Sequence, residues 1–137
     1  MRAAAIVAAL LLAGAAPVFA AEKPDPAEAR YTPAYQKCLD RPDGQSTLGM
    51  IGCASDETDI QDKALNAAYR KAMKDLTAEQ KPKLQAAQRA WIAFRDAECA
   101  SYEDDDWGTI SKINAATCLL HMTVQRTIDL ENYPPPT

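Results

Sequence analysis

The sequence predicts an all-α protein, a small disulfide-bonded helical bundle made of a long antiparallel helical hairpin, a third long helix and a short N-terminal helix. Three observations predict this class. Apolar residues recur at three- and four-residue steps over long stretches of the chain. Helix-start and turn signals separate these stretches. Four cysteines in a chain of 137 residues are typical of a small exported domain that disulfides stabilise.

The chain divides into four segments by composition. Residues 1–20 begin with Arg2, continue as an apolar run and end in small residues, which predicts a signal peptide cleaved after Ala20. Residues 21–33 contain three prolines and no sustained apolar period, which predicts a flexible leader. A helical domain over 34–131 and a Pro-rich tail over 132–137 follow. We therefore expect a periplasmic or secreted protein without a stable membrane anchor.

The first two helices have recognisable start signals. Thr32 followed by Pro33 predicts a short helix to about Leu39, which the turn sequence at 41–44 ends. A longer helix begins after Ser46 or Thr47 and runs to about residue 76. One side of it carries a repeating apolar stripe, formed by Met50, Ile60, Ala64, Leu65, Ala68, Tyr69, Ala72, Met73 and Leu76.

The third helix follows the second directly. Thr77 and Gln80 match a capping box, with Thr77 as the N-cap and Gln80 reaching back to it. The apolar stripe of this helix is Leu84, Ala87, Trp91 and Phe94. Trp91 and Phe94 are expected to supply much of the aromatic packing of the bundle.

A polar loop at 101–108 separates the third helix from the fourth. Thr109 is expected to cap the fourth helix, and the prolines after Tyr133 end it. Its apolar face consists of Ile113, Ala116, Leu120, Val124 and Ile128. Short connections predict that successive helices are antiparallel neighbours.

The cysteines are Cys38, Cys53, Cys99 and Cys118, and three pairings are possible. Their spacing matches neither a redox motif nor a zinc knuckle, so structural disulfides are expected. Proximity in sequence favours Cys38 with Cys53 and Cys99 with Cys118. Geometry alone leaves the choice open, because Cys53 and Cys99 would lie at a similar level of the hairpin.

A polar series follows one side of the third helix, at steps of three and four residues. It consists of Gln88, Trp91, Arg95 and Glu98. Folding the hairpin would bring Gln88 near Asn66, and Arg95 near Asp59 or Asp62. The resulting seam is either a ligand cleft or a structural seam that fixes helix register. We favour the structural interpretation, because no nucleophile with an adjacent base is evident.

The loop before the fourth helix joins an acidic run to an aromatic residue. It contains Glu103, Asp104, Asp105, Asp106 and Trp107. The run is interpreted first as a solvated connector, and the alternative is a recognition tip for a basic partner, because a tryptophan after four acids is costly to leave in water. The run lacks the alternating ligand pattern of a calcium site, so no metal is expected.

Charge and composition exclude several functions. The formal net charge is −4, and loss of Arg2 with the signal would make it more negative, which disfavours nucleic-acid binding. The single histidine, His121, excludes a usual His-based zinc site. We expect no cofactor and no catalytic residue. A cell-wall hydrolase using Glu98 and His121 ranks last, since it would require these side chains to meet in one cleft.

Several motifs together resemble the lysozyme-inhibitor LprI-like N-terminal domain family, over about residues 38–130. These are Met50-x-x-Cys53, Leu65-Asn66-x-x-Tyr69, Gln88-x-x-Trp91-Ile92-x-Phe94-Arg95-Asp96-x-Glu98-Cys99, Cys118-Leu119 and Thr123-x-x-Arg126. The resemblance implies an exported, all-helical, disulfide-bonded domain, and it supports pairing Cys99 with Cys118. It also implies lysozyme inhibition, which is attributed to the member that names the family, and it supplies no catalytic residue.

The resulting hypothesis is an exported acidic binding module that inhibits lysozyme by occluding its cleft. The expected partner is lysozyme or another basic protein. The alternative is a non-enzymatic structural or stress-related envelope protein with an unknown partner.

Overall fold

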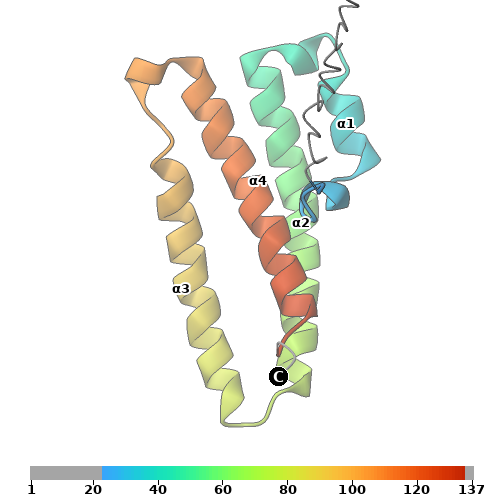
Figure 1. Cartoon of the computed structure of the whole chain (residues 1–137), viewed down its shortest axis with the longest axis vertical. Helices are drawn as coiled ribbons and strands as arrows, with labels where there is room; N and C mark the ends of the chain where they lie inside the picture. The colour runs from blue at the N-terminus through green and yellow to red at the C-terminus, as the bar shows by residue number, and fades with distance from the viewer. Residues whose placement is uncertain (1–22, 135–137) are drawn as a thin grey trace, which may run out of the picture.

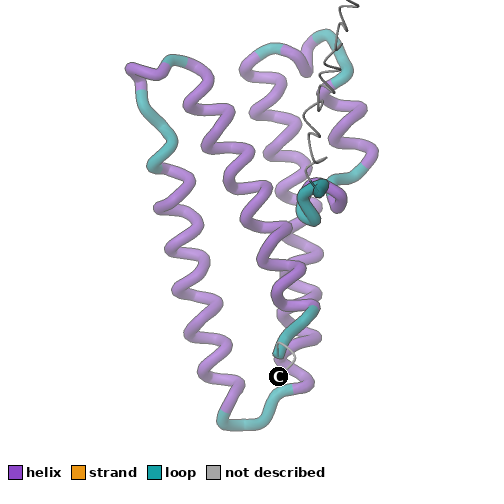
Figure 2. Tube along the Cα trace, in the orientation of Figure 1, coloured by secondary structure: helices purple, strands orange, loops and turns teal. Residues whose placement is uncertain are grey.

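The computed structural model describes residues 23–134. Its α-helices are α1 (Pro33–Leu39), α2 (Thr47–Asp75), α3 (Gln80–Ala100) and α4 (Thr109–Glu131). Three short 3-10 helices lie between or before them, namely η1 (Glu28–Arg30), η2 (Asp43–Gln45) and η3 (Asp105–Trp107) (Figure 2). The all-α class is therefore confirmed. The signal peptide predicted for residues 1–20 and the last three residues of the tail lie outside the described residues.

The central element of the bundle is α4, the last helix in the described chain. Its most extensive packing is with α2, and α3 also packs against it (Figure 1). Although a short turn joins α2 to α3, their backbones make little contact with each other. The expected long hairpin is thus an antiparallel pair that is held together through α4.

Side-chain capping forms at the starts of α1 and α2 as the sequence predicts. The Thr32 Oγ1 accepts a hydrogen bond from the Tyr35 backbone N–H at 3.3 Å. The Ser46 Oγ accepts one from the Gly49 backbone N–H at 3.0 Å. These bonds satisfy donors that the first turn of a helix leaves without partners.

The capping box before α3 is also confirmed. The Thr77 N–H donates to Gln80 Oε1 at 3.1 Å, and the Gln80 N–H donates to Thr77 Oγ1 at 3.2 Å. The predicted cap at Thr109 is wrong, because α4 begins after Gly108 without a side-chain cap. Gly108 has a φ of 66°, a conformation that favours glycine and turns the chain into α4.

The apolar core has two parts along the bundle. One part joins α2, the start of α3 and the end of α4, through Leu65, Ala68, Ala72, Leu76, Leu84 and Leu130. The other joins Ala27 to Leu120 and Val124 of α4. Trp91 packs against the first part, but Phe94 remains 57% exposed. The expectation that Phe94 would fill the core is therefore wrong.

Two disulfides link neighbouring elements. Cys38 pairs with Cys53 and joins α1 to α2, and Cys99 pairs with Cys118 and joins the end of α3 to α4. Their Cα–Cα distances are 5.7 Å and 5.5 Å, which are normal for disulfides. This is the pairing favoured by sequence proximity.

The described part of the predicted flexible leader, residues 23–33, is packed against the bundle. Ala27 is completely buried, and Arg30 forms an ion pair with Glu131 at the end of α4. The expectation of flexibility is wrong for these residues. The reason is that Ala27 and Tyr31 pack against Leu120 and Val124 of α4, and buried polar contacts add to this apolar packing.

Glu57 provides those polar contacts from inside α2, where it is only 1% exposed. Its carboxylate accepts hydrogen bonds from the Thr32 N–H at 2.8 Å and the Thr32 hydroxyl at 2.6 Å. It also accepts from Gln61 Nε2 at 2.7 Å, and the same amide donates to the Arg30 carbonyl at 2.9 Å. Glu57 therefore holds the N-terminal segment onto α2.

The tyrosines of this segment predict an alkaline loss of stability. Burial raises the pKa of Tyr31 to about 12, with nearby Glu28 adding to the effect, and burial also raises the pKa of Tyr35. Because the unfolded chain ionises near pH 10, the folded state binds more protons between about pH 10 and 12. Stability from these residues is complete below pH 10 and is lost through this window as pH rises.

Urea unfolding of wild type and of Tyr31→Phe at pH 9 and pH 11 measures this effect. The substitution should make the decrease between these two pH values smaller. An equal decrease in both proteins would show that Tyr31 does not contribute.

Candidate interaction site

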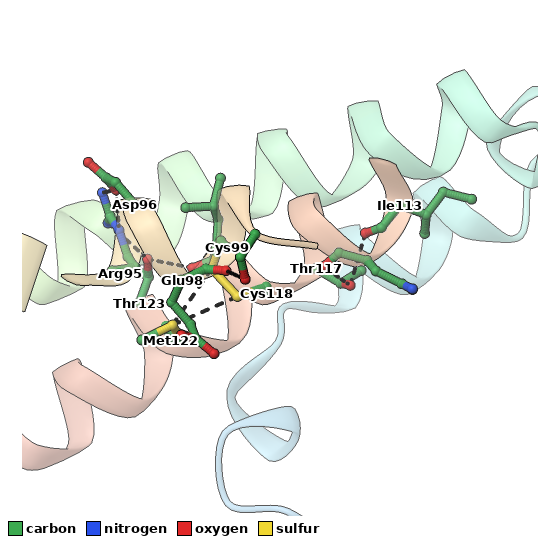
Figure 3. The surroundings of a disulfide bond; sticks show 12 residues. Arg95, Asp96, Glu98, Cys99, Ile113, Thr117, Cys118, Met122 and Thr123 are labelled. Atoms are coloured by element: carbon green, nitrogen blue, oxygen red, sulfur yellow. Dashed lines mark hydrogen bonds and ion pairs between the residues drawn. A yellow bond between two sulfur atoms is a disulfide. The ribbon is translucent and has the colours of Figure 1, made fainter. Parts of the chain in front are cut away.

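The packed side of α3 carries polar residues whose partners lie on α4. Gln88 is 8% exposed, and its Oε1 accepts a hydrogen bond from Arg126 Nε at 2.9 Å. Arg95 donates from Nη1 to the Thr123 hydroxyl at 3.3 Å and pairs with Asp96 on its own helix at 2.8 Å (Figure 3). A polar seam therefore joins α3 to α4.

Trp91 lies within this seam between two guanidinium groups. The Arg95 Cζ is 5.2 Å from the indole ring centroid, and the Arg126 Cζ is 5.8 Å from it. Both distances are in the cation–π range. Arg95 lies on the same helix as Trp91 and Arg126 lies on α4, so the contact with Arg126 is the one that joins the two helices.

The predicted seam between α2 and α3 is wrong in its partners. Asn66 donates within α2, to the Asp62 carboxylate at 2.9 Å, and the cross-helix bonds of Gln88 and Arg95 go to α4. Asn66, Gln88 and Arg95 nevertheless line one cleft of about 290 Å³ between α2 and α3. The prediction thus placed these residues on facing surfaces but did not identify what they bind.

Sequence reasoning also missed Arg126 and Thr123 as members of the seam. These residues are three positions apart, which puts them on one face of α4. That spacing was a usable signal. It could not be interpreted without knowing that α4, and not α2, packs against this side of α3.

We call residues 103–107 the acidic tip. All five are exposed, and Trp107 is 62% exposed. The Asp104 carboxylate accepts from the Asp106 N–H at 2.8 Å, which caps η3 and gives the loop a defined shape. The tip therefore presents acidic groups and an indole ring together to solvent.

The starts of α2 and α4 lie at the same end of the bundle as the acidic tip (Figure 1), and each carries an exposed apolar residue. Leu48 at the start of α2 is 82% exposed, and Ile110 at the start of α4 is 53% exposed. A 3.4 Å hydrogen bond between the hydroxyls of Thr47 and Thr109 brings these two helix starts together. This end of the molecule thus carries exposed apolar surface beside a concentrated negative charge.

Glu98 and His121, the pair considered for hydrolysis, line the same open groove beside the Cys99–Cys118 disulfide. The His121 Nε2 is 3.7 Å from the Asp25 carboxylate. Within the described residues, the Glu98 carboxylate has no hydrogen bond or ion pair. The geometry brings the two residues to one surface without forming an acid–base pair between them.

Two kinds of feature are absent from the described residues. No helix among them is apolar over a length that could cross a membrane. In residues 23–134, no three histidine, cysteine, aspartate or glutamate side chains are grouped in a way that could hold a metal ion.

These features define a class of protein, a small helical domain with two disulfides, a polar α3–α4 seam and an exposed acidic tip. The family described as lysozyme inhibitor LprI matches residues 38–130. The chain belongs to this family. It is also similar to the uncharacterised protein R02472 of Rhizobium meliloti (strain 1021), with 31% identity over 140 residues, covering 96% of this chain and 94% of the relative. No solved structure matches the chain significantly.

Proposed function

We propose that this protein is an exported, non-enzymatic binding domain that inhibits lysozyme by occluding its cleft through the acidic tip. Membership of the lysozyme inhibitor LprI family supports the activity. The observation that supports the tip as the contact is Trp107, which is 62% exposed beside four acids. The predicted signal at residues 1–20 supports a periplasmic or secreted location.

The chemistry of the tip suits a basic partner. Lysozymes are commonly basic, so the negative charge of the tip would steer the two proteins together and orient them. A tryptophan at the centre of such a contact is a typical anchor, because it buries a large apolar area on binding. Charge would therefore mainly set the association rate, and Trp107 would slow dissociation.

We expect substitution of Asp104, Asp105 and Asp106 together by asparagine to weaken lysozyme inhibition about tenfold, at about 0.5 kcal/mol for each charge removed. Asparagine at 104 retains an acceptor for capping η3. The measurement is a cell-wall lysis assay in which oxidised protein is titrated against a basic c-type lysozyme at low and high salt. Inhibition by wild type should weaken with salt, and that of the variant should depend on salt less.

The control is a variant with the same net charge that is altered away from the tip. Asp56, Asp75 and Asp129 are exposed positions on α2 and α4, and their joint change to asparagine should leave inhibition near the wild-type level. Equal inhibition by the tip variant and wild type would exclude the tip mechanism. Absence of inhibition by wild type against several lysozyme types would instead favour the alternative, a structural envelope protein with another partner.

A further inference from the structure

An open groove of about 570 Å³ lies at the end of α3 beside the Cys99–Cys118 disulfide. Three segments form it, namely the N-terminal segment, the last turns of α3 and the middle of α4. Met122 forms part of its floor, with its Sδ 3.6 Å from Cys99 Sγ and 3.8 Å from Cys118 Sγ (Figure 3). The disulfide joins the α3 side of the groove to α4, and the hydrogen bonds of Glu57 hold the N-terminal segment in place.

The groove has aromatic walls that the fold leaves uncovered. Phe94 is 57% exposed and Tyr102 is 39% exposed, and Tyr31 lines the groove from the N-terminal segment. Phe94, Glu98 and Tyr102 are spaced four residues apart, so the helix and the turn after it place them along one side. Exposed aromatic rings gathered in a concave surface are typical of a contact for another molecule.

The groove carries negative charge, because two of its lining residues are glutamates without an ion-pair partner in the groove. Two of its lining residues are Glu28 and Glu98, and neither carboxylate forms an ion pair in residues 23–134. The arginines nearest in sequence have other partners, because Arg30 pairs with Glu131 and Arg95 pairs with Asp96. The groove therefore offers carboxylates beside aromatic faces, and His121 is the only basic side chain among its lining residues.

We propose that this groove binds an arginine side chain of a protein partner. A guanidinium is planar, so it stacks on an aromatic ring while it donates paired hydrogen bonds to a carboxylate. A lysine ammonium is a compact, strongly hydrated point charge and would use this combination less well. The groove adjoins the acidic tip, since Tyr102 directly precedes Glu103. As a contact for lysozyme in particular, the groove rests on the function proposed above.

The direct test uses a probe that is independent of lysozyme. A capped Gly-Arg-Gly peptide is titrated into the oxidised, ¹⁵N-labelled protein, and amide shifts are followed by NMR. Saturable shifts should concentrate at Phe94, Glu98, Tyr102 and His121. A capped Gly-Lys-Gly peptide should bind more weakly, and a capped Gly-Glu-Gly peptide should not bind.

Two variants assign the binding to the groove. Glu98→Gln and Phe94→Ala alter exposed side chains and should each weaken binding of the arginine peptide about two- to five-fold. Asp75→Asn removes one exposed charge at the C-terminal end of α2, which does not line the groove, and should leave binding unchanged. Shifts spread evenly over the surface, or equal weakening by all three variants, would overturn the proposal.

The lysis assay separates this proposal from the proposed function. Lysozyme inhibition without binding of the arginine peptide would overturn the proposal that the groove binds arginine, and it would leave the inhibitor function intact. Binding of the peptide at the groove without inhibition would support the arginine-binding proposal and overturn its assignment as a contact for lysozyme.

Discussion

Replacing Glu57 with alanine is expected to lower the free energy of unfolding by about 3 kcal/mol, because it leaves several buried hydrogen-bond donors without an acceptor. The donors are the Thr32 N–H and hydroxyl and the Gln61 side-chain amide. Urea denaturation at pH 7 measures the loss. Hydrogen exchange should show the amides of residues 27–32 becoming less protected than those of α2, since Glu57 holds that segment in place.

Two variants control this experiment. Asp56→Ala changes the adjacent exposed acid on the same helix and should alter stability by less than about 0.5 kcal/mol. Glu57→Gln keeps one acceptor oxygen and should fall between the alanine variant and wild type. A Glu57→Ala protein as stable as Asp56→Ala would show that these hydrogen bonds do not hold the N-terminal segment.

Removing the second disulfide, by Cys99→Ser with Cys118→Ser, should also cost about 3 kcal/mol, the chain-entropy value for a loop of this size. The effect should be concentrated in α3. Only Leu84, Gln88 and Cys99 of that helix are buried, so the last turns of α3 depend on the disulfide for their attachment to α4. Hydrogen exchange should show faster exchange near the end of α3 than in α2.

The first disulfide provides a matched comparison. Removing it by Cys38→Ser with Cys53→Ser opens a loop of similar length, so a similar loss of stability is expected. The loosened element should then be α1. Unchanged protection of α3 in the Cys99 and Cys118 double variant would mean that the polar seam alone holds that helix.

Local features of this fold could be predicted because short-range chemistry determines them. Ser46 and the Thr77–Gln80 pair form the expected caps, since a cap depends on residues only three positions apart. The disulfide pairing also followed sequence proximity. These features do not require knowledge of how distant helices pack.

The errors arose where a helix face had to be matched to a partner. Periodicity placed Trp91 and Phe94 on one stripe, yet the buried side of α3 runs through Leu84, Gln88, Trp91, Arg95 and Cys99. That side packs mainly on α4, and the sequence alone does not indicate that α3 packs more closely on α4 than on α2. Ala27 was missed for a related reason, because one buried alanine has no periodic pattern.

The position of α4 has a consequence for the order in which the chain can fold. Helical bundles usually fold quickly because their contacts are local in sequence. Here the helix on which α2 and α3 both pack is the last of the four to be synthesised, and the ion pair from Arg30 to Glu131 joins residues 101 positions apart. The nascent chain therefore lacks its central packing surface until α4 is complete, so α2 and α3 reach their final packing only after α4 has been synthesised.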